Sequence, residues 1–272
     1  MLKQRILVVV VLLPIGLLAI YLGGVAFMAV VALLLGLAGW EYAQLFRSGG
    51  NQPASALVVA GILLLVIGRW WSGFDGAPWI LTLMVLASMT VHLVAYERGR
   101  DQAGTDFAIT ISGILYIGWL GAYLVSIRAL PEGVWWVLLV LPAIWIADGG
   151  AYFIGRAFGR HKLSPRLSPK KTWQGYLGGI AVGPLGTALL AWLWANLSGA
   201  GTAISPLDGI ILGVILAVFA PLGDLGESMI KRQFGIKDSG KILPGHGGAF
   251  DRIDSWLWAA AIGYYVIIWL LI

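Results

Sequence analysis

The sequence predicts an all-α, polytopic integral membrane protein with about nine transmembrane helices. Its 272 residues are 59% apolar and only 11% charged, and the mean hydropathy is +0.87. Soluble proteins carry about 25% charged residues, so this chain is too apolar for an ordinary soluble fold. The absence of cysteine excludes disulfides, thiolate-bound zinc and thiol catalysis.

Nine apolar segments approach the length of about 20 residues that a helix needs to cross the hydrocarbon core. They cover residues 6–22, 25–45, 54–71, 77–95, 107–127, 134–154, 174–196, 208–227 and 254–271. The first two are expected to form a hairpin that turns at Gly23 and Gly24. We find no internal repeat and no soluble domain, so residues 1–272 are expected to form a single transmembrane domain.

The distribution of positive charge predicts the orientation in the membrane. With a cytoplasmic N-terminus and nine spans, 16 of the 18 Lys and Arg residues fall in cytoplasmic segments, and only Arg69 and Arg128 fall outside. Lys and Arg concentrate on the cytoplasmic side of membrane proteins. We therefore expect a cytoplasmic N-terminus, an external C-terminus, and two polar loops, 155–173 and 228–253, on the cytoplasmic side.

The densest polar run lies between the last two apolar segments, from Ser228 to Asp254. Its charged residues and its histidine are Lys231, Arg232, Lys237, Asp238, Lys241, His246, Asp251, Arg252 and Asp254. Carboxylate oxygens bind divalent ions, and Lys and Arg bind phosphate oxygens. Such a run beside the membrane, with a Gly-rich turn at 245–248, indicates a site for a metal ion and a polyphosphate.

Several acids lie within or beside the apolar segments, where an ionisable side chain is costly and indicates function. Asp148 lies in the sixth segment. Asp224 and Glu227 are three residues apart and share a helical face, as do Asp251 and Asp254. The predicted topology places all of them toward the cytoplasmic side, where we expect one polar cavity. Helix caps or structural ion pairs are the alternative, above all at Asp254, which lies near a helix start.

The loop from Gly155 to Thr172 is a second polar feature and reads GRAFGRHKLSPRLSPKKT. Its two Ser-Pro pairs recur at an interval of four residues, which predicts a rigid, turned loop. Lys170 and Lys171 stand directly before the seventh apolar segment, where the free N–H groups of a helix start bind phosphate. The alternative is a solvated basic loop that faces anionic lipids.

Two motifs carry a resemblance to a known family. The first is S-x-x-K-R-x-x-x-x-K-D-x-x-x-x-x-P-G-H-G-G-x-x-D-R-x-D, from Ser228 to Asp254, and the second joins DGGAY at 148–152 to SPKKTWQG at 168–175. Together they resemble the phosphatidate cytidylyltransferase (CDP-diacylglycerol synthase) family. Residues 1–130 add little beyond hydropathy. Gln174 stands where that family often has Glu, so we assign this side chain no acid or base role.

The resemblance implies an enzyme of phospholipid biosynthesis in an inner membrane of bacterial type. It would convert CTP and phosphatidate to CDP-diacylglycerol and pyrophosphate, and loops 155–173 and 228–253 would be catalytic. The expected partners are CTP, phosphatidate and the lipid bilayer; a homodimer is left open and no nucleic acid is expected. Mg²⁺ is the expected cofactor, with a second metal ion left open, because bound metal ions neutralise the charge of transferring phosphates.

The expected roles fall on residues of these motifs. The expected catalytic residues are Asp224, Asp251, Lys231 and Arg252. The expected metal ligands are Asp148, Asp224, Asp251 and Asp254, and we expect Asp224 and Asp251 to share a magnesium ion. The expected substrate-binding residues are Ser168, Lys170, Lys171, Thr172, Ser228, Arg232, Lys237, Lys241, His246 and Gly247.

Two other functions remain as alternatives at this point. A transporter would use the acids as an ion path, but it would need acids near the midplane and preferably repeat symmetry. Another CTP-dependent lipid phosphotransferase, such as a CDP-alcohol phosphotransferase or a polyprenol kinase, is the second alternative. The D-G-x-x-A-R…D-x-x-x-D pattern expected of a CDP-alcohol phosphotransferase is absent from the sequence.

Overall fold

The computed structural model describes residues 2–198, 204–240 and 247–272, with side chains from residue 10 onward. The chain divides into two compact units. Unit 1 comprises Met1–Ser126 and Ile230–Ile253, and unit 2 comprises Ile127–Met229 and Asp254–Ile272. The single transmembrane domain expected over residues 1–272 stays a prediction.

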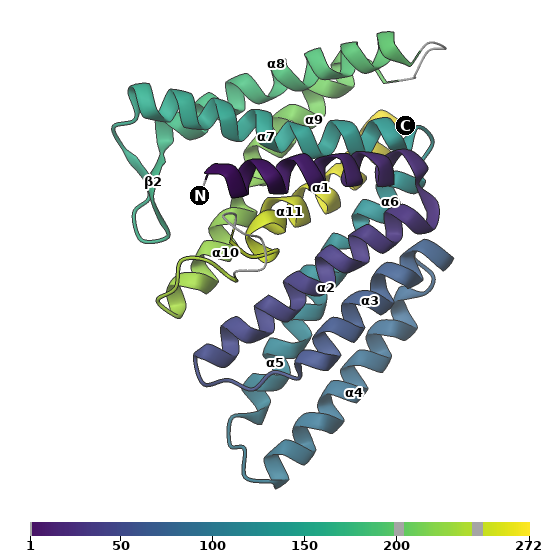
Figure 1. The fold of residues 1–272 in the computed structure, drawn as a ribbon, viewed down its shortest axis with the longest axis vertical. Helices are drawn as coiled ribbons and strands as arrows, with labels where there is room; N and C mark the ends of the chain where they lie inside the picture. The colour runs from purple at the N-terminus through teal and green to yellow at the C-terminus, as the bar shows by residue number, and fades with distance from the viewer. Residues whose placement is uncertain (1, 199–203, 241–246) are drawn as a thin grey trace. The chain divides into compact units, whose positions relative to one another are not determined.

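Most of the described chain is helical (Figure 1). The elements before residue 130 are α1 Leu2–Leu22, α2 Gly24–Ser48, α3 Ser55–Ser72, α4 Ala77–Glu97, α5 Ala103–Gly113, the π-helix η1 Ile114–Trp119, and α6 Tyr123–Ala129. The remaining elements are α7 Gly133–Phe158, β1 Lys162–Ser164, β2 Ser168–Thr172, α8 Trp173–Leu197, α9 Pro206–Phe219, α10 Pro221–Gln233, α11 Phe250–Val266, and the π-helix η2 Ile267–Leu271.

Eight helical stretches within the described residues are long and apolar enough to cross a membrane. They are Gly24–Ser48, Ser55–Ser72, Ala77–Glu97, Ala103–Ala129, Gly133–Phe158, Trp173–Leu197, Pro206–Gln233 and Phe250–Leu271, which match the second to ninth predicted segments. The first predicted segment corresponds to α1, a helix of 21 residues whose part with described side chains, Val10–Leu22, is apolar. The all-α polytopic class is therefore confirmed, and the count of nine holds approximately.

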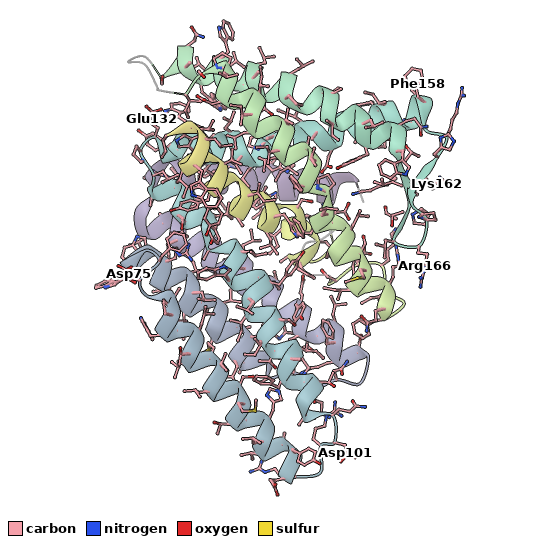
Figure 2. The ribbon with its side chains drawn as sticks, turned by 180° about the vertical axis from the view of Figure 1, so that it is seen from behind. Asp75, Asp101, Glu132, Phe158, Lys162 and Arg166 are labelled. Atoms are coloured by element: carbon pink, nitrogen blue, oxygen red, sulfur yellow. The ribbon has the colours of Figure 1, made fainter. Side chains whose placement is uncertain are left out.

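Unit 1 is built around α2, α3, α4 and the α5–η1 run, which pack along one another (Figure 1). The chain turns between α1 and α2 at Gly23 and Gly24, whose φ angles of 64° and 49° are open to glycine at little cost. Asp75 and Asp101 flank α4 at its opposite ends (Figure 2). The inner face of α2 carries Glu41, which is only 1% exposed.

An ion pair in unit 1 joins the loop after α4 to the first turn of α5. Arg100 Nε lies 2.7 Å from Asp106 Oδ2, and the Gln52 backbone N–H donates to Asp106 Oδ1 at 2.7 Å. Arg100 Nη2 also donates to the Gly50 carbonyl oxygen at 2.9 Å. The hydrogen bond with Asp106 raises the pKa of the Arg100 guanidinium, which stays charged. Asp106, an acid inside an apolar span, is thus compensated by a cation.

Unit 2 contains α7, α8 and α9, and α8 packs along both neighbours (Figure 1). Glycines permit this close approach, because a Cβ atom at Gly178 would lie 2.6 Å from Ile154 Cβ, and one at Gly213 would lie 2.6 Å from Pro184 Cα. Small residues allow helix backbones to approach closely in membranes. The tight packing of these helices fixes the end of α7 and the start of α8, between which the hairpin lies.

Strands β1 and β2 form this antiparallel hairpin, which the all-α prediction did not include. Lys162 pairs with Thr172, and Ser164 pairs with Ser168. Figure 2 shows Lys162 and Arg166 on the hairpin, beyond Phe158 at the end of α7. The turned loop expected from the two Ser-Pro pairs therefore takes the form of a short hairpin.

The hairpin is tied to the start of α8 by side chains. Gln174 Oε1 accepts hydrogen bonds from the backbone N–H groups of Arg160 at 3.0 Å and His161 at 3.1 Å. Gln174 Nε2 lies 2.8 Å from His161 Nδ1. Thr172 caps α8, since its Oγ1 accepts from the Gly175 N–H at 3.1 Å. The amide of Gln174 is thus engaged in holding the hairpin.

Candidate active site

Three carboxylates of unit 2 come together at one place: Asp224 and Glu227 of α10 and Asp254 of α11. One oxygen of each lies within 4.8 Å of the oxygens of the other two. Glu227 is buried, and the other two are half-buried. We call this group the acidic triad. Hard cations such as Mg²⁺ take oxygen ligands, so the donor set fits a divalent ion.

The local sequence explains why the triad forms. Asp224 and Glu227 are three residues apart on α10 and therefore share a face. Gly223 has no side chain, and a Cβ atom there would collide with the Asp254 carbonyl oxygen and lie 2.9 Å from Trp258 Cδ1. The glycine lets the first turn of α10 approach α11 at Asp254. This approach places the third carboxylate beside the other two.

Lys171, at the end of the hairpin, reaches the triad. Its Nζ lies 2.5 Å from Asp224 Oδ2, and the two side chains are 27% and 35% exposed. Ser228 Oγ donates to Asp224 Oδ1 at 3.3 Å. Asp224 therefore contacts a cation through one oxygen and a hydroxyl group through the other, and it lies close to two further carboxylates. A partly exposed position suits residues that must meet a ligand from solution.

Asp251 lies in unit 1, where the protein surrounds it with donors. Lys231 Nζ lies 2.6 Å from Asp251 Oδ1. Asp251 Oδ2 accepts from Ser239 N at 2.9 Å, Ser239 Oγ at 3.0 Å and Gly248 N at 2.8 Å. Gly247 has a φ of 87°, and a Cβ atom there would lie 2.7 Å from the same oxygen, so glycine is needed at this turn.

Sequence reasoning missed Glu41, which joins this arrangement from α2. Its Oε2 accepts from the Phe250 N–H at 2.9 Å and from Ser239 Oγ at 3.1 Å. We call Glu41, Lys231, Ser239 and Asp251 the Asp251 cluster. The signal for Glu41 was present in the sequence, because an acid inside an apolar segment indicates function wherever it occurs.

The other expected site residues are placed as follows. Asp148 is exposed on α7, and Lys170, Lys237 and Arg252 are exposed as well. Arg232 is exposed and donates from Nη1 to the Ile236 carbonyl oxygen at 3.2 Å, and Ser168 is half-buried in β2. Lys241 and His246 lie outside the described residues. Glu227, which we did not expect as a ligand, joins Asp224 and Asp254, whereas the sharing of one ion by Asp224 and Asp251 stays a prediction.

Comparison with known proteins gives the chain a chemical class. The sequence pattern of the cytidylyltransferase family matches residues 3–270, so the chain belongs to this family of nucleotidyltransferases. The chain is 38% identical over 275 residues to a phosphatidate cytidylyltransferase of Pseudomonas aeruginosa, covering 99% of this chain and 97% of that protein.

Two further relatives carry the same name. The phosphatidate cytidylyltransferase of Brucella suis is 35% identical, covering 97% of this chain and 92% of the relative. The one of Synechocystis is 32% identical, covering 98% of this chain and 97% of the relative. The family resemblance drawn from the two motifs is thus confirmed over nearly the whole chain, including residues 1–130.

Proposed function

We propose that this protein is a membrane-embedded phosphatidate cytidylyltransferase, which converts CTP and phosphatidate to CDP-diacylglycerol and pyrophosphate. The observation that carries the proposal is the acidic triad with Lys171 beside it, in a chain whose relatives of that name match it from end to end. A transporter or another CTP-dependent lipid phosphotransferase is not favoured, because neither accounts for this full-length similarity.

The reaction sets a clear electrostatic task. An oxygen of the phosphatidate phosphate forms a bond to the α-phosphorus of CTP, and the bond from that phosphorus to the bridging oxygen of the β-phosphate breaks. The electron pair leaves with pyrophosphate. Because the attacking phosphate is already an anion, no strong general base is required. Such transfers depend on positioning and charge neutralisation.

We propose that Mg²⁺ is the cofactor and that the acidic triad holds it. The metal, when bound, neutralises phosphate charge during the transfer. The triad fits this role, because its three oxygen donors are close enough to serve one ion and carry mutually repelling charges. We also propose Asp148 and Asp251 as metal ligands, and a second metal ion stays open.

Lys171 is proposed to hold a substrate phosphate. Its ammonium group already lies against Asp224, so a phosphate that approaches the triad meets this cation. Thr172, the next residue, caps α8 and fixes the backbone from which Lys171 extends. Lys170, Arg232 and Lys237 remain proposed phosphate-binding residues, as do Lys241 and His246 beyond the described part of the chain. Arg252 remains a proposed catalytic residue.

We propose that the site opens to the cytoplasm of a bacterial-type cell. The support is the charge split, since a cytoplasmic N-terminus and nine spans would place 16 of the 18 Lys and Arg in cytoplasmic segments. Reporter fusions at Gly50, Gly104, Lys162 and Gly240 should all give a cytoplasmic signal. A periplasmic signal at Lys162 or Gly240 would contradict the orientation.

The function is tested with the purified full-length chain in mixed micelles. Incubation with CTP, Mg²⁺ and phosphatidate should release CDP-diacylglycerol and pyrophosphate in equal amounts, and omission of any one component should stop both. Replacing phosphatidate by diacylglycerol or a polyprenol tests the alternative phosphotransferases. The proposal is wrong if folded protein makes no CDP-diacylglycerol, or if an alcohol substrate is used in place of phosphatidate.

A further inference from the structure

Glu41 is a buried acid inside α2 that the proposed reaction does not use. It is 1% exposed, and its Oε1 has no hydrogen-bond partner in the described part of the chain. Asp106, the other buried acid of α2–α6, is paired with Arg100, whereas no cation pairs with Glu41 among the described residues. Burying an acid in a membrane span is costly, so its contacts indicate its role.

Those contacts lead to the start of α11. Glu41 Oε2 accepts the backbone N–H of Phe250, the first residue of α11, at 2.9 Å. The first N–H groups of a helix have no partner within the helix and need an acceptor from elsewhere. A Cβ atom at Gly240 would collide with Glu41 Oε1, and one at Gly248 would collide with Oε2. The carboxyl group therefore fits closely between two backbone segments.

Ser239 links Glu41 to Asp251. Its Oγ lies 3.1 Å from Glu41 Oε2 and 3.0 Å from Asp251 Oδ2, and its N–H donates to the same Asp251 oxygen. A hydroxyl group has one hydrogen, so it donates to one carboxylate at a time. The orientation of the Ser239 side chain thus depends on both acids.

We propose that Glu41 is a positioning residue for the cytidylyl transfer: through Ser239 and the Phe250 N–H it holds the start of α11, and with it the carboxylate of Asp251, in one orientation. The inference rests on the proposed function, because it assigns Asp251 to the reaction. Glu41 acts as a hydrogen-bond acceptor, and its negative charge is not required. Side chains that orient a reacting group typically contribute about 10- to 100-fold to activity.

The test compares Glu41→Leu, Glu41→Gln and Ser239→Ala in the full-length protein. Leucine removes both hydrogen bonds, whereas glutamine keeps an acceptor oxygen for Phe250 and Ser239. The exposed Glu97 on α4 gives the matched control Glu97→Leu. Two quantities are measured on folded protein: kcat and KM for CTP, and hydrogen exchange of peptides covering residues 247–256.

We expect Glu41→Leu to lower kcat about 10-fold or more with little change in KM, and to speed exchange at the start of α11. Glu41→Gln should restore both, Ser239→Ala should lower kcat by less, and Glu97→Leu should match wild type. The inference is overturned if Glu41→Leu keeps wild-type kcat and exchange, or if Glu41→Gln is as impaired as Glu41→Leu.

If Glu41→Leu does not fold, Ser239→Ala decides the question. It should lower kcat and speed exchange at the start of α11, and unchanged values for both would refute the inference. The exchange measurement needs no substrate. A wild-type protein that makes no CDP-diacylglycerol would therefore refute the proposed function, whereas the exchange result would still show whether Glu41 holds the start of α11.

Discussion

The acidic triad and the Asp251 cluster differ in how their negative charges are compensated. In the cluster, one Asp251 oxygen faces the Lys231 ammonium group, and the other accepts two backbone N–H groups and lies 3.0 Å from the Ser239 hydroxyl oxygen. In the triad, three carboxylates lie together, and Lys171 is the cation beside Asp224. The protein therefore compensates the Asp251 carboxylate with its own groups, whereas we propose that a bound cation compensates the triad.

This difference distinguishes carboxylates that hold the fold together from carboxylates that bind a ligand, which the sequence alone could not distinguish. A carboxylate surrounded by N–H donors and a lysine is fixed in place, and its loss should disturb the fold as well as the reaction. Carboxylates that repel one another should be dispensable for folding and needed for ligand binding. The predictions below test this division.

The largest loss of activity is expected from neutralising Glu227 or Asp254, the two acids that lie beside Asp224 in the triad. Glu227→Gln and Asp254→Asn should each lower kcat about 100-fold or more, because phosphate charge is no longer balanced in the transition state. Steady-state assays at saturating CTP measure this loss. If the kcat of either variant stays within about threefold of the wild-type value, the substituted residue does not take part in the reaction.

Asp251→Asn should have the largest effect on stability. It leaves the buried Lys231 ammonium group without this carboxylate, and breaking such a pair costs about 3 kcal/mol or more. The melting temperature in a metal-free buffer should fall by about 5 °C or more. Asp224→Asn is the matched control and should not melt lower than wild type. Equal melting temperatures for the two variants would contradict the claim that the cluster stabilises the fold and the triad does not.

Lys171→Ala should have a smaller effect, confined to binding. The apparent KM for CTP or for phosphatidate should rise about tenfold, because one charge-assisted contact to phosphate is lost. Lys162→Ala is the control, since Lys162 is exposed on β1 and has no acidic partner among the described residues. If Lys171→Ala leaves both KM values unchanged, the lysine belongs to a solvated basic loop.

Hydropathy predicted the helices well, because the length of a span is dictated by the membrane. The segment expected at 77–95 is the helix Ala77–Glu97, and the segment expected at 174–196 is Trp173–Leu197. The turn at Gly23 and Gly24 also forms as expected. The β1–β2 hairpin was harder to foresee, because strands of three and five residues carry almost no periodic signal.

The candidate site was predicted only in part, for geometric reasons. Asp251 and Asp254 are one helical turn apart on the same face, so spacing alone cannot say which of them meets Asp224 and Glu227. Glu41 contacts residues about 200 positions further along the chain, and such a pairing leaves no local pattern. What the sequence did show was the cost of an acid in an apolar segment, which applies to Glu41 as much as to Asp224.

A magnesium titration of wild type and Asp224→Asn tests the central claim most directly. Asparagine keeps the shape of the side chain and removes its charge, so it separates metal binding from packing. Both activity and melting temperature are followed against Mg²⁺ concentration. We predict that the variant folds normally, has little activity at ordinary Mg²⁺ and gains less thermal stability from added Mg²⁺, and that without metal it melts no lower than wild type. Near-wild-type activity with the same Mg²⁺ dependence would contradict the account and leave Asp224 with a structural role.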